Sequence, residues 1–179
     1  MPILKSIKAA LRASEEKFRT VADYTYDWEY WENPDGNFNY ISPSCKRITG
    51  YSAQEFIDDS KLLDQIILPE DRNIWSNHRR EAIEELKLRE VQFRIRRKDG
   101  EIRWIEHACQ QVIDDRGEFL GFRASNRDIS ARKKSEQELQ VALSEIKQLR
   151  NKLEVESVYL QEEIKQEHNF ENIIGQSDV

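Results

Sequence analysis

Side chains that could bind a metal ion or attack a substrate are few in this 179-residue sequence, which holds three His and two Cys residues. His107 and Cys109 are two residues apart on a predicted strand and could offer an imidazole and a thiol, but a metal site needs more ligands than these two. Cys45 and Cys109 are too far apart for a zinc motif or a redox Cys-x-x-Cys pair. Since no Ser/His/Asp set or carboxylate pair stands out either, the sequence predicts no enzyme.

The composition is that of a globular protein with a core of ordinary size. Charged residues make up 35% of the chain, and four Trp, six Tyr and seven Phe can supply the core. A net charge of −6 gives no support for a surface that binds DNA or RNA. There is no apolar run of about 18 residues and no apolar signal-peptide region at the N-terminus. From the lack of a membrane span we expect no contact with a membrane. From the two distant cysteines we expect a reduced, cytoplasmic protein.

Aromatic residues and turn formers divide the chain near residue 130. All aromatic residues except Tyr159 and Phe170 precede residue 131, and residues 122–174 contain neither Gly nor Pro. This distribution predicts a compact domain followed by one long helix.

Within the compact part, the hydrophobic pattern changes between helical and strand periods. An amphipathic helix is predicted over residues 4–21, a hairpin over 28–42, and short helices beginning near Ser44, Ser52 and Pro69, the last extending to about Leu88. Three strands follow, over about 91–96, 102–113 and 119–128, with Lys98-Asp-Gly100 and Asp114-Asp-Arg-Gly117 as turns. The order predicts an α+β fold with an antiparallel sheet.

Several short motifs now carry a resemblance to a known family. Residues 14–130 resemble a PAS sensory domain with a PAC-type C-terminal half. The matching segments are Ser14-Glu-Glu-Lys-Phe-Arg, Tyr40-Ile-Ser-Pro-Ser, Ile48-Thr-Gly-Tyr51, Pro69-Glu-Asp71, Arg97-Lys-Asp-Gly-Glu-Ile-Arg-Trp104 and Asn126-Arg-Asp-Ile-Ser130. The resemblance implies a five-stranded antiparallel sheet, helices over one face, and a small cavity between them. It makes residues 1–13 a helical lead-in to that domain.

The resemblance also raises the question of a bound cofactor, which the residues themselves do not identify. Some PAS domains bind haem through a histidine on the helix that carries His78, but His78 has the polar neighbours Asn77, Arg79 and Arg80. We therefore expect its ring to face solvent. Light-sensing relatives use a cysteine within the pattern GxNCRFLQ, which is absent around Cys45, so we expect a structural thiol there. The ligand stays unknown, and neither haem through His78 nor flavin through Cys45 is expected.

The end of the last strand resembles the Asp-Ile-Thr motif that joins a PAS sheet to its outgoing helix. Here the motif is Asp128-Ile129-Ser130, and Arg132 follows Asp128 by four residues. We predict that Asp128, Ser130 and Arg132 couple the sheet to the helix, with an Asp128–Arg132 ion pair and Ser130 as the N-cap. An ordinary helix start is the alternative.

Residues 131–168 are predicted to form a coiled-coil linker that pairs in parallel with a second copy. Leu139, Ile146, Leu153 and Leu160 recur every seven residues. Ala142 and Leu149 fill a companion column, which Glu156 and Glu163 then interrupt. Beyond that point Ser157 and Ile164 offer a better companion set. The shift has the form of a four-residue stutter near Leu153. A solvated single helix is the alternative.

The tail carries a second resemblance, which bears on the output. Residues 153–160 and 170–177 resemble the lead-in to the AAA+ domain of sigma-54-dependent transcription activators, and residues 169–179 would begin that domain. The phosphate-binding motif GxxxxGK[ST] does not occur, so we expect no ATP hydrolysis by this chain. The alternatives are the sensor part of a histidine kinase or a diguanylate cyclase, and a PAS dimerisation module without a ligand.

Overall fold

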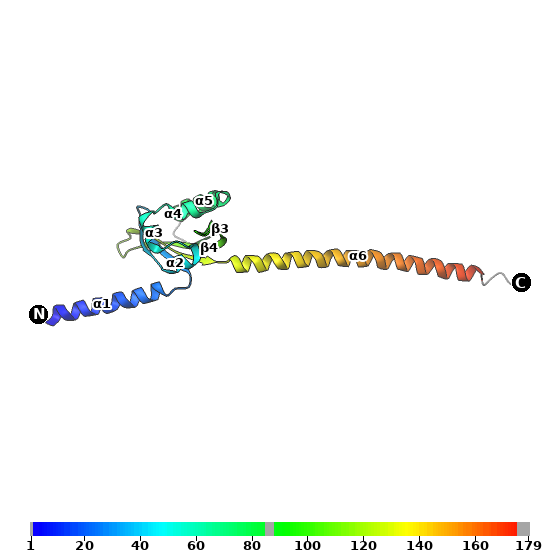
Figure 1. Cartoon of the computed structure of the whole chain (residues 1–179), viewed down its shortest axis with the longest axis horizontal. Helices are drawn as coiled ribbons and strands as arrows, with labels where there is room; N and C mark the ends of the chain where they lie inside the picture. The colour runs from blue at the N-terminus through cyan, green and yellow to red at the C-terminus, as the bar shows by residue number, and fades with distance from the viewer. Residues whose placement is uncertain (1, 85–87, 175–179) are drawn as a thin grey trace. The chain divides into compact units, whose positions relative to one another are not determined.

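The computed structural model describes residues 2–84 and 88–174, and their side chains within 7–84 and 88–165. It separates into two compact units, residues 1–131 and 132–179. The first contains the sheet and its covering helices, and the second is helical throughout its described part (Figure 1). Among the described residues, no helix combines the length and the apolar character that a bilayer span requires.

The first unit is built around one antiparallel sheet of five strands in the order β2-β1-β5-β4-β3. Its strands are β1 (Trp28–Glu32), β2 (Phe38–Ile41), β3 (Arg89–Arg96), β4 (Ile102–Ile113) and β5 (Phe119–Asp128). The two ends of the domain meet at the centre of the sheet, because β1 pairs with β5. This is the α+β arrangement that the sequence predicts.

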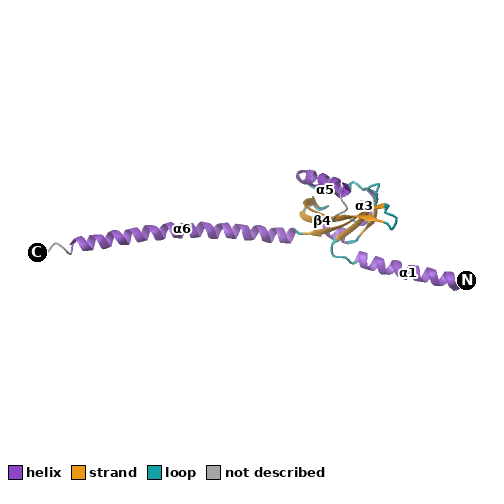
Figure 2. Cartoon of the chain, turned by 180° about the vertical axis from the view of Figure 1, so that it is seen from behind, coloured by secondary structure: helices purple, strands orange, loops and turns teal. Residues whose placement is uncertain are grey.

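Helices lie between the two strand groups in sequence and cover one face of the sheet (Figure 2). They are α2 (Ser44–Thr49), α3 (Ala53–Asp58), α4 (Leu62–Ile66), the 3-10 helix η1 (Pro69–Asp71) and α5 (Arg72–Glu84). Ser52 and Glu55 form a capping box at the start of α3, where the sequence predicts that a helix begins. The core between helices and sheet includes the fully buried side chains of Trp28, Phe56, Phe93, Ile95 and Ile105.

The helix predicted from Pro69 to Leu88 differs in its boundaries. It begins as η1 and is described as α5 to Glu84, whereas Leu88 is already outside it. The physical reason is that Arg89 begins β3, whose backbone pairs with β4. Asp71, the last residue of η1, joins the helices to β3: its buried carboxylate accepts hydrogen bonds from the backbone N and the guanidinium of Arg94, at 2.7–2.9 Å.

Gly121 occupies a position on β5 where a side chain does not fit. Its φ of +113° lies in the left-handed region, and a Cβ there would lie 1.9 Å from the backbone oxygen of Glu32. The close approach of β1 and β5 at this point therefore requires glycine.

Two long helices flank the sheet in sequence. The helix α1 (Pro2–Asp23) exposes Ile7, Leu11, Phe18 and Val21, which belong to the predicted apolar stripe. The helix α6 (Ser130–Ile174) extends six residues beyond the predicted end at residue 168. The expected AAA+ lead-in, 169–179, is thus helical to Ile174, and its last five residues lie outside the described part of the chain.

Candidate functional site

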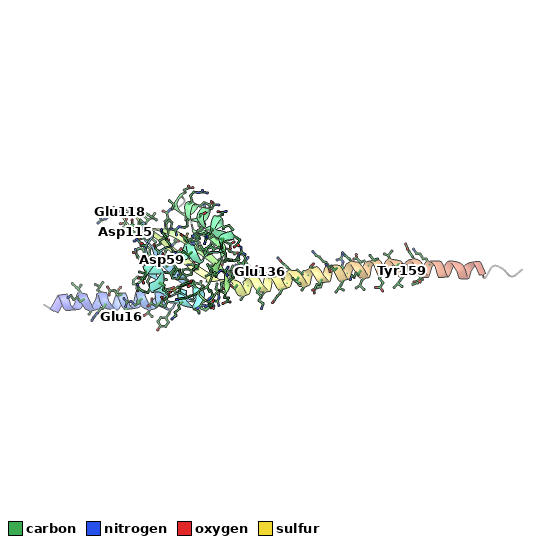
Figure 3. All side chains as sticks on the ribbon, turned by 45° about the horizontal axis from the view of Figure 1, so that its top comes forward. Glu16, Asp59, Asp115, Glu118, Glu136 and Tyr159 are labelled. Atoms are coloured by element: carbon green, nitrogen blue, oxygen red, sulfur yellow. The ribbon has the colours of Figure 1, made fainter. Side chains whose placement is uncertain are left out.

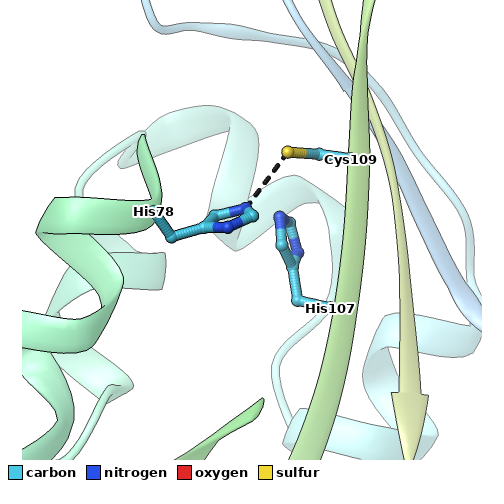
Figure 4. A group of neighbouring side chains, drawn as sticks. All are labelled: His78, His107 and Cys109. Carbon is cyan, nitrogen blue, oxygen red and sulfur yellow. Dashed lines mark hydrogen bonds between the residues drawn. The ribbon is translucent and has the colours of Figure 1, made fainter. Parts of the chain in front are cut away.

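Two elements bring three potential metal ligands together inside the domain. On β4, Ile105, His107 and Cys109 alternate toward the core, as a strand period of two requires. On α5, Trp75, His78 and Ala82 form the buried face that packs toward this sheet. One nitrogen from each imidazole and the Cys109 sulfur lie within 4.8 Å of one another, and all three residues are buried (Figure 4).

The expectation that His78 faces solvent is wrong. Only 5% of this residue is exposed, and its ring lies 5.8 Å from the Trp75 ring at an interplanar angle of 23°. The polar neighbours Asn77 and Arg80 are exposed, because residues one and two positions away point to other sides of a helix. His107, for which the sequence left both orientations open, points inward and is 1% exposed.

Hydrogen bonds fix the protonation of the His107 ring. Asn126 lies opposite His107 on β5, and its Nδ2 donates to the backbone oxygen of Trp28 at 2.9 Å. Its Oδ1 therefore faces His107 Nδ1, at 2.7 Å, and accepts a hydrogen bond from it. The proton lies on Nδ1, so Nε2 of His107 retains a free lone pair.

Burial keeps the cluster neutral. It lowers the pKa of His107 to about 3, against the smaller opposing effect of the Asn126 hydrogen bond. It also lowers the pKa of His78. Burial raises the pKa of the Cys109 thiol to about 11, while the positive charge of Arg79 acts in the other direction. At neutral pH the three groups are thus two neutral imidazoles and a thiol, with His78 Nε2 3.2 Å from the sulfur.

A small cavity adjoins the cluster. Its volume is about 30 Å³, and its walls include Tyr30, Trp75 and Phe122 beside the three potential ligands. Glu32 and Arg79 also line it and form an ion pair, in which Arg79 Nη1 lies 3.2 Å from Glu32 Oε2. This volume suits one or two water molecules or an ion, whereas pockets for drug-sized molecules hold about 300–1,000 Å³.

Cys45 lies apart from this cluster, on α2, as a buried structural thiol. It is fully buried, and its sulfur lies 3.5 Å from the backbone oxygen of Tyr51. Burial raises its pKa to about 12, so it is protonated and a poor nucleophile at neutral pH. The burial expected of Cys45 is confirmed, and its purely structural role stays a prediction.

The joint between β5 and α6 is held by the backbone of Trp104 on β4. The Ile129 N–H donates to the Trp104 oxygen at 2.9 Å, and the Trp104 N–H donates to Ser130 Oγ at 2.9 Å. The sequence predicts the Ser130 hydroxyl as the N-cap of α6. In the structure this hydroxyl accepts a hydrogen bond from the neighbouring strand β4.

Asp128 completes the joint with two interactions. Its Oδ1 accepts from the Ser130 N–H at 3.0 Å, and its Oδ2 lies 2.6 Å from Arg103 Nη1. Both interactions lower the pKa of Asp128 against the effect of burial. Arg132 Nε lies 3.7 Å from Glu136 Oε1. The ion pair between Arg132 and Asp128 stays a prediction.

The residues predicted for the dimer interface are exposed on α6. Leu139, Ile146, Leu149, Leu153, Leu160 and Ile164 have 48–64% of their surface accessible. Every side chain from Lys134 to Lys165 is exposed, and Figure 3 shows those of Glu136 and Tyr159 standing away from the helix. Their pairing with a second copy stays a prediction.

Comparisons with known proteins agree with this architecture. Residues 38–126 match the family described as the PAS fold. The White collar 2 protein of Neurospora crassa is 32% identical over 80 residues, which are 45% of this chain and 15% of that protein. A blue-light-activated histidine kinase of Brucella anthropi is 28% identical over 105 residues, 59% of this chain and 21% of the kinase.

Among solved structures, a sensory box histidine kinase/response regulator from Burkholderia thailandensis is similar, with a TM-score of 0.58 and 26% identity. The match covers 74% of this chain and 98% of that one. With the sheet order and the covering helices, these matches define the sheet-containing unit as a PAS domain. The chain therefore carries a sensory module of the PAS family and corresponds to a small part of the curated relatives' length.

Sequence reasoning found His107 and Cys109 but missed His78 and Asn126 as their neighbours. A usable signal exists in each case. Trp75, His78 and Ala82 follow the 3–4 spacing of a buried helix face, and Asn126 continues the inward set of Phe122 and Ala124 on β5. Polar residues at core positions of a periodic pattern indicate a buried polar site.

Proposed function

We propose that the chain is a cytoplasmic sensory module that detects a small ligand and passes its state through a dimeric α6 to an output domain. The contact between Trp104 and the start of α6 carries this proposal. Ile129 and Ser130 each bond to the Trp104 backbone, one to its oxygen and one to its N–H. A displacement of β4 would therefore move these two hydrogen bonds and, with them, Ser130, the first residue of α6.

The same strand carries two of the three residues of the interior cluster, and His78 on α5 is the third. His107 and Cys109 lie three and five residues beyond Trp104 on β4, which corresponds to about 10 and 17 Å along a strand. A ligand shifts a conformational equilibrium only if it binds two states differently. A ligand beside His107 would bind two states differently if β4 and α5 take different positions in those states. Because β4 also supports the start of α6 through Trp104, such a change would reach the helix.

The exposed apolar column of α6 supports pairing with a second copy. An isolated polar helix gains little stability from its own sequence, whereas a heptad column gains from burial against a partner. Leu139, Ile146, Leu153 and Leu160 offer such a column. The two free cysteines support the reducing cytoplasm as the compartment.

The resemblance of the tail to a sigma-54 activator supports transcription activation as the output. Two of the similar proteins, from Brucella anthropi and Burkholderia thailandensis, are histidine kinases and favour that alternative. In either case the signal would leave the PAS domain through α6, so the sensory part of the proposal is the same for each output.

Fusion proteins distinguish the two outputs. Residues 1–179 are joined either to the AAA+ and DNA-binding domains of a sigma-54 activator or to a kinase core, each with its own reporter. We expect the reporter output of the first fusion to be regulated. Ser130→Ala should fix that output at one level. Ser130→Thr, which retains the hydroxyl, should preserve the regulation. Regulated output from the kinase fusion alone would select the alternative, and no effect of Ser130→Ala would contradict the role of the joint.

A further inference from the structure

The cluster of His78, His107 and Cys109 has the composition of a binding site for a transition-metal ion. Its donors are two imidazole nitrogens and one sulfur, which together suit Zn²⁺ and copper better than Mg²⁺ or Ca²⁺. The donors come from two elements, α5 and β4, whose packing brings them within 4.8 Å of one another. This separation needs only a small contraction to reach metal–ligand distances of about 2.0–2.3 Å around a central ion.

The hydrogen bond from His107 to Asn126 prepares one ligand for this role. Histidine ligands commonly donate their second ring N–H to an oxygen acceptor, which fixes the tautomer and the ring orientation. His107 makes such a bond to Asn126 Oδ1 at 2.7 Å, and Asn126 is itself held by the Trp28 backbone. The Nε2 lone pair is thus available without any proton transfer.

The other two ligands need one deprotonation between them. His78 Nε2 and the Cys109 sulfur lie 3.2 Å apart, so a hydrogen bond joins them in the metal-free protein. An ion that binds both replaces this bond, and the thiol proton leaves to solvent, with one proton released per ion. The guanidinium of Arg79, which lines the adjacent cavity, favours the thiolate that forms, and the carboxylate of its ion-pair partner Glu32 opposes it.

Three protein ligands leave a fourth tetrahedral position open. The cavity of about 30 Å³ borders all three and has room for a water molecule or a small exogenous ligand there. A site with three protein ligands and an open position differs from the closed four-ligand sites that only stabilise a fold.

We propose that His78, His107 and Cys109 bind one Zn²⁺ or copper ion inside the PAS domain, with the fourth position open to the cavity. This inference deepens the proposed function and depends on it only for the role of the ion as the detected ligand. The ion would tie α5 to β4, the strand that supports the start of α6.

Metal titration of the full chain tests the site. The purified protein is stripped with a chelator under reducing conditions and then titrated with Zn²⁺ and, separately, with Cu⁺, each against a chromogenic competitor. We expect one ion per chain, and the ion that wins in direct competition is the one the site selects. Cys109→Ser and His78→Gln should each weaken binding by about 100-fold or more. Cys45→Ser, at a buried cysteine outside the cluster, is the matched control and should bind as the unmodified chain does.

X-ray absorption on the metal-loaded, unmodified chain needs no variant to fold. We expect one sulfur ligand at about 2.3 Å and two or three nitrogen or oxygen ligands at about 2.0–2.1 Å for Zn²⁺. A spectrum without sulfur, substoichiometric binding, or equal affinity of Cys109→Ser would show an adventitious ion only and overturn the site.

The outcomes separate this inference from the proposed function. A chain that binds no ion but still regulates its fused output loses only the metal site. A chain that binds one ion with the expected ligands but shows ion-independent output keeps the site and loses the ion as the signal.

Discussion

His107 and Asn126 face each other across β4 and β5 in the centre of the domain, with Nδ1 and Oδ1 2.7 Å apart. Both side chains are buried, at 1% and 0% exposure, so neither can replace this hydrogen bond with one to bulk solvent. The pair therefore both stabilises the fold and sets the tautomer of a potential ligand.

Replacement of Asn126 by Ala should destabilise the domain by about 1–3 kcal/mol, because His107 Nδ1 and the Trp28 oxygen each lose a partner in the interior. Urea unfolding followed by tryptophan fluorescence measures the loss. Ser125→Ala, on the same strand but on the opposite side, is the control and should change stability by less than about 0.5 kcal/mol. Equal losses of stability in the two variants would show that the hydrogen bond between His107 and Asn126 does not stabilise the domain.

Asp71→Asn should lower stability by about 1–3 kcal/mol at neutral pH, since the buried carboxylate accepts three hydrogen bonds from Arg94. Arg94 lowers the pKa of Asp71 in the folded protein. The stabilisation is therefore present above the unfolded value of about 3.8 and disappears as pH falls through the lower folded value. Denaturation of both proteins at pH 7 and at pH 3 should give a smaller difference at pH 3; a constant difference would contradict the assignment.

Gly121→Ala should cost at least about 3 kcal/mol, because the new methyl group collides with the Glu32 backbone and the residue keeps a left-handed φ. Gly117 also has a positive φ, but open space surrounds its Cβ position. Gly117→Ala should thus cost about 1 kcal/mol, the conformational part alone. Similar midpoints of thermal unfolding for both variants would show that β1 and β5 do not approach closely at Gly121.

The predicted stutter in α6 gives two alternative columns beyond Leu153, one with Glu156 and Glu163 and one with Ser157 and Ile164. The Ile164 column buries fewer charges and should be the resting one. Replacement of both Glu156 and Glu163 by Leu should select the other column and raise dimer stability by more than about 1 kcal/mol. Sedimentation equilibrium measures the change.

Cross-linking is the second check on the two columns. A photo-reactive amino acid placed at 156 or at 157 leaves both native cysteines unchanged. Preferential cross-linking from 157 is expected. Equal, ligand-independent cross-linking at both positions, with dimer stability and output unchanged by the Leu pair, would make the helix a passive tether.

The sequence was sufficient to predict the α+β fold because its strands alternate cleanly and its turns carry Asp and Gly. Val91, Phe93 and Ile95 show the alternation, and the Lys98-Asp-Gly100 turn closes β3 onto β4 as expected. The family resemblance predicted one antiparallel sheet of five strands, but the order of the strands was not predicted. Pairing of β1 with β5 joins residues about a hundred positions apart, and no local pattern reports it.

The interior site could be predicted only in part, for a physical reason. Charge and polarity of neighbours indicate the exposure of a residue only when those neighbours share its face. Arg79 follows His78 directly, yet its guanidinium reaches Glu32 at the cavity while Arg80 bonds to Asn77 on the surface. The helical spacing from Trp75 to Ala82 was the better guide to His78. The partners of Asp128 likewise include Arg103, which is adjacent in the sheet but distant in sequence.

Native mass spectrometry of the freshly purified full chain tests the account most directly, because it reports stoichiometry and bound species together. The central claim is a PAS sensor that works as a pair joined through α6. It predicts a species of twice the 21.3 kDa chain mass at low micromolar concentration. After truncation behind Ser130, the observed mass should be that of one truncated chain. One metal ion per chain in that dimer would add support for the interior site. A full-length chain that remains at 21.3 kDa up to high micromolar concentration would contradict the central claim.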